Sequence, residues 1–180
     1  MMRYERKVTV LGAVLGGLLF IWAAGLVFSP ERMAARSESI RLVAGKTADA
    51  ASILISSTSD LSLAKDGNIW YLMDNGAKLP AQTKRIESFL EALAAVNRLK
   101  PMARSKDAWK DFGLEEGKAK RLVVKDASGK TLCEIAVGEY GTTGAEVYLR
   151  RAGSDESYTA DSAISSYLGY GRTSWLDLRV

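Results

Sequence analysis

The sequence of 180 residues contains no histidine, one cysteine and three prolines. Without histidine, neither a Ser-His-Asp nor a Cys-His catalytic arrangement can form, and no histidine can bind zinc, iron or copper. The single Cys133 cannot close an internal disulfide or build a cysteine-rich metal cluster. We therefore expect a fold stabilised by a packed core, with no metal and no cofactor.

The charged residues also lack a strong bias of one sign. Lys and Arg number 25 against 21 Asp and Glu, which gives a formal net charge of +4. Half of this excess comes from Arg3, Arg6 and Lys7, which outnumber Glu5 in the first seven residues. The rest of the chain has no basic stripe that could neutralise phosphates, so nucleic acid is not an expected partner.

One long apolar run stands near the start of the chain. Residues 8–28 contain no charged side chain, and Thr9 is their only polar one. A helix of this length rises about 32 Å, which is enough to cross a hydrocarbon core of about 30 Å. A cleaved signal peptide is the alternative, but its apolar region is shorter and ends in small residues, whereas Leu26, Val27 and Phe28 stand here. We predict a retained transmembrane helix.

The basic cluster before this run predicts the orientation. Short, positively charged ends stay in the cytoplasm, so residues 1–7 are expected there and the chain after the helix outside, in the periplasm of a bacterium. The protein would then be a single-pass protein of the inner (cytoplasmic) membrane. Small residues within the helix could let a second helix pack closely, or could reflect the general frequency of glycine in membrane helices. This candidate packing face consists of Gly12, Ala13, Gly16 and Gly17.

Residues 29–51 are predicted to connect the membrane helix to a folded domain at 52–180. Within the connection, residues 31–43 could form a short helical stem or a solvated linker. The run Ala44-Gly45-Lys46-Thr47 imitates the end of a phosphate-binding loop, but Ile40 occupies the position where that motif needs glycine. No nucleotide site is expected here.

The sequence predicts an α+β domain of antiparallel β-meanders with one main helix and short helices. Asp66-Gly67 predicts a type I′ hairpin turn. Residues 83–99 carry apolar side chains at helical spacing and predict the main helix, and residues 106–112 predict a helical turn that ends at Gly113. Residues 101–105 are expected to be extended, and a last short helix is expected at 161–168. Strands are predicted at 52–56, 61–63, 69–73, 121–125, 131–137, 145–151 and 156–160.

A pattern of aromatic residues and glycines runs through this domain: Trp70, Pro80, a helix, Trp109-x-x-Phe112-Gly113-Leu114, a strand hairpin, Gly138 and Tyr148. The pattern resembles an uncharacterised bacterial family, domain of unknown function four-three-four-zero, over roughly residues 52–178. The C-terminal tail is similar to the family's Arg-Asp-x-x-Leu ending, with Leu176 in place of the Arg and Asp177 retained. The resemblance implies a membrane-anchored accessory protein that often occurs beside gliding-motility-type ABC export components.

Candidate sites within the domain are few. Residues 138–144 have three glycines but lack the spacing of a phosphate cradle, so a flexible hairpin loop is the better interpretation. Cys133 lies in an alternating strand and is expected in the core. Large aromatic side chains could be core residues or anchors for a partner protein. The candidate partner surface consists of Trp70, Trp109, Tyr140, Tyr148 and Trp175.

These observations predict a noncatalytic, membrane-anchored accessory or scaffold subunit of a bacterial ABC-type export complex, which contributes an extracytoplasmic interaction domain. Its expected partners are integral membrane transport subunits, and no enzymatic activity is expected. An extracytoplasmic ligand-binding or sensor module is the alternative. A hydrolase that uses Ser with Lys is a third candidate, although no motif places the two residues together.

Overall fold

The computed structural model describes residues 42–57, 60–96 and 99–179. The predicted transmembrane helix at 8–28, with its face of small residues, lies outside the described residues, as do residues 1–7 and the first part of the predicted connection. No helix in the described part of the chain is long and apolar enough to cross a membrane. The described residues belong to one compact unit.

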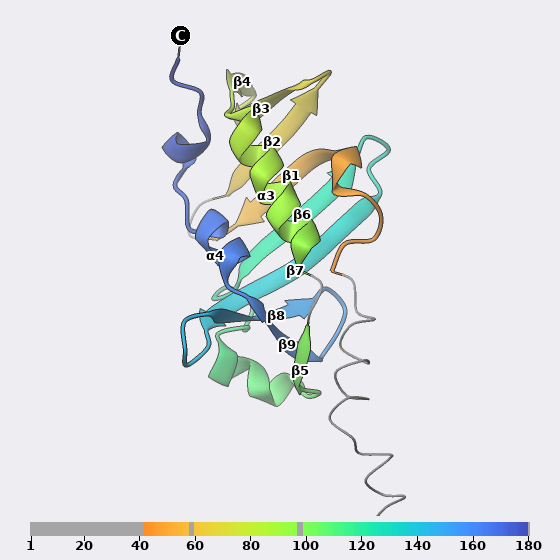
Figure 1. Cartoon of the computed structure of the whole chain (residues 1–180), viewed down its shortest axis with the longest axis vertical. Helices are drawn as coiled ribbons and strands as arrows, with labels where there is room; N and C mark the ends of the chain where they lie inside the picture. Colours follow the sequence, from red (N-terminus) through yellow and green to blue (C-terminus); the bar gives the residue numbers. More distant parts are fainter. Residues whose placement is uncertain (1–41, 58–59, 97–98, 180) are drawn as a thin grey trace, which may run out of the picture. The chain divides into compact units, whose positions relative to one another are not determined.

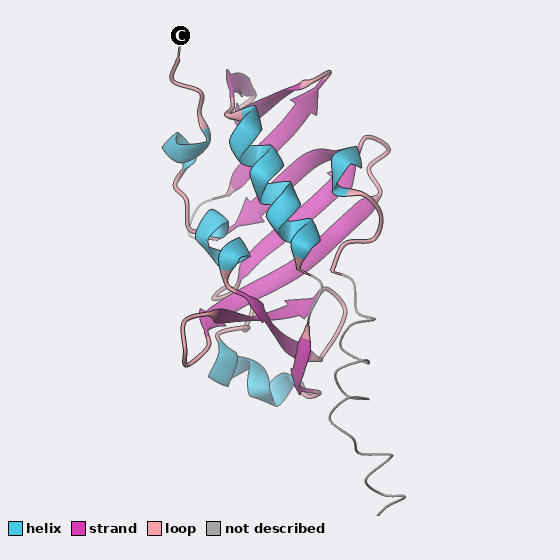
Figure 2. Ribbon diagram, in the orientation of Figure 1, coloured by secondary structure: helices cyan, strands magenta, loops and turns pink. Residues whose placement is uncertain are grey.

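The domain is built on one antiparallel sheet (Figure 1; Figure 2). Among the described residues its strand order is β4-β3-β2-β1-β6-β7-β8-β9-β5, and every neighbouring pair is antiparallel. This confirms the α+β prediction at the level of an antiparallel sheet with few helices. The strands are β1 (Ala50–Ser56), β2 (Leu61–Asp66), β3 (Ile69–Asp74), β4 (Ala77–Pro80), β5 (Lys100–Ala103), β6 (Lys120–Asp126), β7 (Thr131–Tyr140), β8 (Glu146–Arg151) and β9 (Ser157–Asp161).

Strand β1 joins the two predicted meanders into this single sheet. It pairs with β2 on one side and with β6 on the other, and these neighbours lie far apart in sequence. Ile53 stands opposite both Leu63 and Val124, and all three side chains are buried. Leu54 points the other way and is 39% exposed. The alternation of β1 therefore separates a core face from a second, more exposed face of the sheet.

The core face is covered by helices α3 (Thr83–Ala95) and α4 (Ala163–Leu168), which lie on the same side of the sheet in Figure 2. The main helix ends four residues before the predicted Leu99, because the backbone of Val96 is already extended. Short 3-10 helices complete the described structure: η1 (Thr47–Asp49), η2 (Lys106–Phe112) and η3 (Arg172–Trp175). The buried side chains of α3 are Ile86, Phe89, Leu90 and Leu93.

The turn between β2 and β3 differs from the prediction. Its two central residues are Gly67 and Asn68, and only Gly67 has a positive φ, of 61°. Positive φ at the first central residue alone is the pattern of a type II′ turn rather than type I′. Glycine adopts this conformation without steric cost, which explains the position of Gly67.

The folded core also begins earlier than residue 52. Leu42 and Val43 are only 6% and 9% exposed, and the backbone N–H of Ala44 donates to the carbonyl of Leu132 at 2.6 Å. Part of the predicted stem thus packs on the domain.

Candidate functional site

Two members of the candidate partner surface lie in the core. Trp70 is 1% exposed and Trp175 is 0% exposed. The Trp175 ring packs edge-on against Phe89 of α3, with ring centroids 5.9 Å apart. Their burial removes both tryptophans from the candidate surface, and only the core alternative remains for them.

Of the other three residues, Trp109 and Tyr148 lie at the second face of the sheet, whereas Tyr140 pairs with the core-facing Val147. Tyr148 and Arg150 alternate in β8 with Val147 and Leu149, which are fully buried in the core, so they point to the opposite face. Both contact η2. Tyr140 lies at the end of β7 and is 52% exposed. Helix η2 therefore covers the β8 end of the face that α3 leaves open.

Local sequence signals define where η2 begins and ends. The hydroxyl of Ser105 accepts a hydrogen bond from the backbone N–H of Asp107 at 3.3 Å, which caps the first turn. Gly113 has a φ of 64° and ends the helix in the left-handed conformation that glycine favours. This confirms the helical turn predicted at 106–112 and its stop at Gly113.

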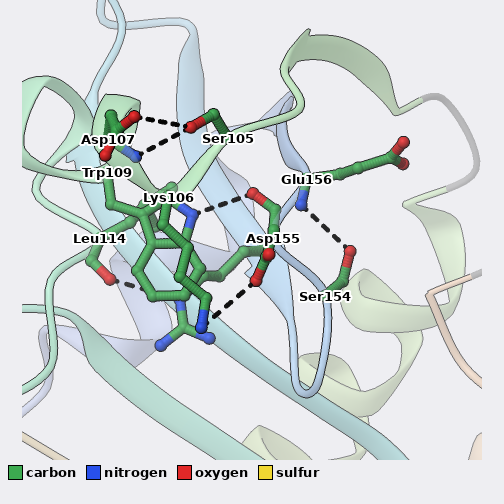
Figure 3. Close-up of polar contacts among 9 residues, drawn as sticks. Ser105, Lys106, Asp107, Trp109, Leu114, Ser154, Asp155 and Glu156 are labelled. Carbon is green, nitrogen blue, oxygen red and sulfur yellow. Dashed lines mark hydrogen bonds and ion pairs between the residues drawn. The ribbon is translucent and has the colours of Figure 1, made fainter.

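Trp109 of η2 is held on the sheet by contacts from three segments (Figure 3). Its indole Nε1–H donates to the carbonyl of Asp155 at 3.0 Å. The guanidinium of Arg150 lies 4.0 Å from the ring centroid, and its Nε–H donates to the carbonyl of Leu114 at 3.3 Å. The ammonium of Lys106 lies 5.5 Å from the same ring and 3.5 Å from the Asp155 carboxylate. We call Lys106, Trp109, Tyr148, Arg150 and Asp155 the Trp109 patch.

A close approach between η2 and β7 holds this patch in place. The rings of Phe112 and Tyr148 stack with centroids 4.4 Å apart. A Cβ atom on Gly138 would lie 2.2 Å from the carbonyl oxygen of Phe112, so only glycine allows η2 to come this near. The glycine spacing predicts a hairpin loop from Gly138, but β7 continues to Tyr140 and the turn begins at Gly141.

A groove of about 530 Å³ borders the Trp109 patch on the same face of the sheet. Arg150 and the ion pair between Arg121 and Glu134 contribute to its lining. The Nε of Arg121 lies 3.1 Å from a carboxylate oxygen of Glu134. Sequence reasoning missed these residues, because charges at alternating strand positions are also typical of an ordinary solvent face.

The described residues offer little reactive chemistry. Cys133 is 2% exposed, and burial raises the pKa of its thiol to about 12, so the thiol stays protonated near neutral pH. This confirms the predicted core position of Cys133. In the part of the chain that the structure describes, no group of three or more Cys, Asp or Glu residues could hold a metal ion.

A family model described as Domain of unknown function (DUF4340) matches residues 70–180. The chain belongs to this family. The family match confirms the resemblance seen in the sequence, but it begins inside β3 rather than near residue 52. No curated protein and no solved structure matches the chain.

The DUF4340 match includes the C-terminal tail with Leu176 and Asp177. Leu176 pairs with Ala81 as an isolated bridge, and its side chain packs against the core. The backbone N–H of Asp177 donates to the carbonyl of Pro80 at 2.9 Å. The tail is therefore fixed beside β4 by these backbone contacts and by the packing of Trp175 and Leu176 against the core.

Proposed function

We propose that the chain is a noncatalytic, membrane-anchored accessory or scaffold subunit of a bacterial ABC-type export complex, and that its Trp109 patch binds another subunit. The patch is the observation that carries the proposal. Trp, Tyr and Arg are the residue types enriched among the energetically dominant residues of protein interfaces. Trp109 and Arg150 are stacked and hydrogen-bonded in the unbound chain, so binding would order few additional side chains.

The membrane location rests on the sequence. The apolar run at 8–28 and the basic residues before it support a single transmembrane helix with a cytoplasmic N-terminus and a periplasmic domain. Contact with integral transport subunits could then occur both within the membrane and through the domain.

The first test removes the centre of the patch. Trp109→Ala in the tagged full-length chain should lower the recovery of membrane transport subunits in mild detergent at least about tenfold, because loss of a dominant interface residue costs about 2 kcal/mol or more. Recovery is measured by quantitative mass spectrometry. Trp109→Phe keeps an aromatic ring for Arg150 but loses the bond to the Asp155 carbonyl, so an intermediate loss is expected.

Lys125→Ala serves as the control, because this lysine is exposed on β6 and makes no ion pair within the described chain. Each variant is first compared with wild type by urea unfolding. A folded Trp109→Ala variant that recovers the same subunits in the same amounts would contradict the proposed surface.

The second test concerns topology. Ala127 is exposed in the turn between β6 and β7, so Ala127→Cys should react with a membrane-impermeant maleimide in intact spheroplasts. The wild-type chain is the control, because its buried Cys133 should not react under native conditions. Labelling that needs cell lysis would place the domain in the cytoplasm and overturn the proposed location.

An extracytoplasmic ligand-binding or sensor module is the second candidate. It is favoured by the groove of about 530 Å³, whose charged lining residues are the two arginines Arg121 and Arg150 and the three carboxylates Glu115, Glu116 and Glu134.

A further inference from the structure

A second groove, of about 550 Å³, lies between the first turn of α3 and the C-terminal tail. Figure 1 shows the tail beside β4 and the start of α3. Two backbone contacts hold the tail there: the N–H of Gln82 donates to the carbonyl of Trp175 at 2.8 Å, and the N–H of Asp177 donates to Pro80. The side-chain amide of Gln82 adds a bond to the carbonyl of Leu176 at 2.9 Å. We call this site the tail groove.

Large apolar side chains are exposed around the tail groove. Ile69 and Tyr170 line it and are 51% and 43% exposed, and Leu178 follows in the tail with 75% exposure. These are three of the six large hydrophobic side chains that are exposed in the described chain. Such clustering around a concave site is typical of protein interaction surfaces.

The charges of the tail groove are mostly positive. Lys84, Arg85 and Arg179 line it against a single carboxylate, Asp177. Within the described chain, neither Lys84 nor Arg179 takes part in an ion pair. The first turn of α3 contains no acidic residue, so the positive end of the helix dipole adds to the same field.

The side chain of Arg85 is held in the tail groove by two contacts. Its Nη1–H donates to the carbonyl of Ser174, and its guanidinium lies 5.4 Å from the ring centroid of Tyr170. The arginine thus joins α3 to the tail and keeps a positive charge beside an exposed aromatic ring. A partner that places a carboxylate here would meet a cation already held in place.

We propose that the tail groove binds an acidic segment of a partner protein that carries a large apolar side chain between its carboxylates. The carboxylates would pair with Lys84 and Arg179, and the apolar side chain would pack against Ile69 and Tyr170. The proposal is independent of the Trp109 patch, because it rests on different residues at a different part of the sheet.

The experiment uses the full-length chain in nanodiscs of neutral lipid. The probe is a fluorescein-labelled peptide in which two Glu residues stand on each side of a Leu-Phe pair, and its binding is followed by fluorescence anisotropy. Saturable binding is expected, and the double variant Lys84→Glu/Arg179→Glu should weaken it at least about tenfold. Ile69→Ser should weaken it severalfold, and a peptide with Lys in place of Glu should not bind.

The matched control is Lys125→Glu/Lys130→Glu, which changes the net charge equally on the exposed β6–β7 hairpin. This double variant and Trp109→Ala should leave the peptide affinity unchanged. Absence of saturable binding, or an equal loss of affinity in the control double variant, would overturn the proposal.

Discussion

Gly138→Ala is expected to lower the free energy of unfolding by about 3 kcal/mol, at the upper end of the usual cost of overpacking. The added Cβ would lie 2.2 Å from the carbonyl oxygen of Phe112 and 3.0 Å from the backbone of Gly113. Backbone atoms cannot rotate away as a flexible side chain can, so η2 must move off β7. Urea unfolding followed by tryptophan fluorescence measures the loss.

Gly141→Ala is the matched control for this prediction. It lies three residues further along, and a Cβ there would meet its nearest neighbour, the carbonyl oxygen of Glu146, at an ordinary 3.6 Å. We expect its stability to stay within about 0.5 kcal/mol of wild type. Equal stabilities of the two alanine variants would show that η2 does not approach β7 this closely.

Trp175→Ala is expected to destabilise the domain by about 3–5 kcal/mol, the usual cost of truncating a buried tryptophan. The side chain is 0% exposed and packs against Phe89 of α3, and its ring lies 6.1 Å from that of Tyr170. Its removal leaves a cavity between the tail and α3 that backbone contacts alone cannot fill. Thermal and urea unfolding of the full-length chain measure the effect.

Trp175→Phe separates packing from hydrogen bonding at the same position. Within the described chain, the indole Nε1 of Trp175 has no hydrogen-bond partner, so phenylalanine loses volume but no polar contact. We expect less than half the destabilisation of the alanine variant. If both substitutions cost the same, the contact of the ring with Phe89 would not be what stabilises the tail.

Much of the secondary structure was predictable from local patterns. Residues 83–95 form the main helix because apolar side chains recur at helical spacing, and Gly113 ends η2 because the chain there needs a positive φ. The predicted strands are also present, with extended or shifted ends, because alternating side chains fit a sheet with one buried face. These signals depend on neighbouring residues only.

The pairing of β1 with β6 was not predictable in this way. This pairing places Ile53 beside Val124, although the main helix and several strands separate the two residues in the sequence. No local pattern in either strand indicates which strand it will pair with. Strand β4 was missed because Ala77–Pro80 is short and lacks a clear alternation. Two meanders were therefore expected where the structure has one sheet.

The sequence by itself determined the class of the fold and its principal elements, because periodicity and turn residues act over short distances. Its family was recognised by resemblance, which the family match over residues 70–180 confirms. Only the tertiary structure decided which aromatic residues are available to a partner. The sequence offered both Trp70 and Trp109 as candidate surface residues. In the structure Trp70 faces the covered side of the sheet and is buried, whereas Trp109 stacks on Arg150 at the opposite face. The physical reason is that burial depends on which face α3 covers, and long-range packing sets that choice.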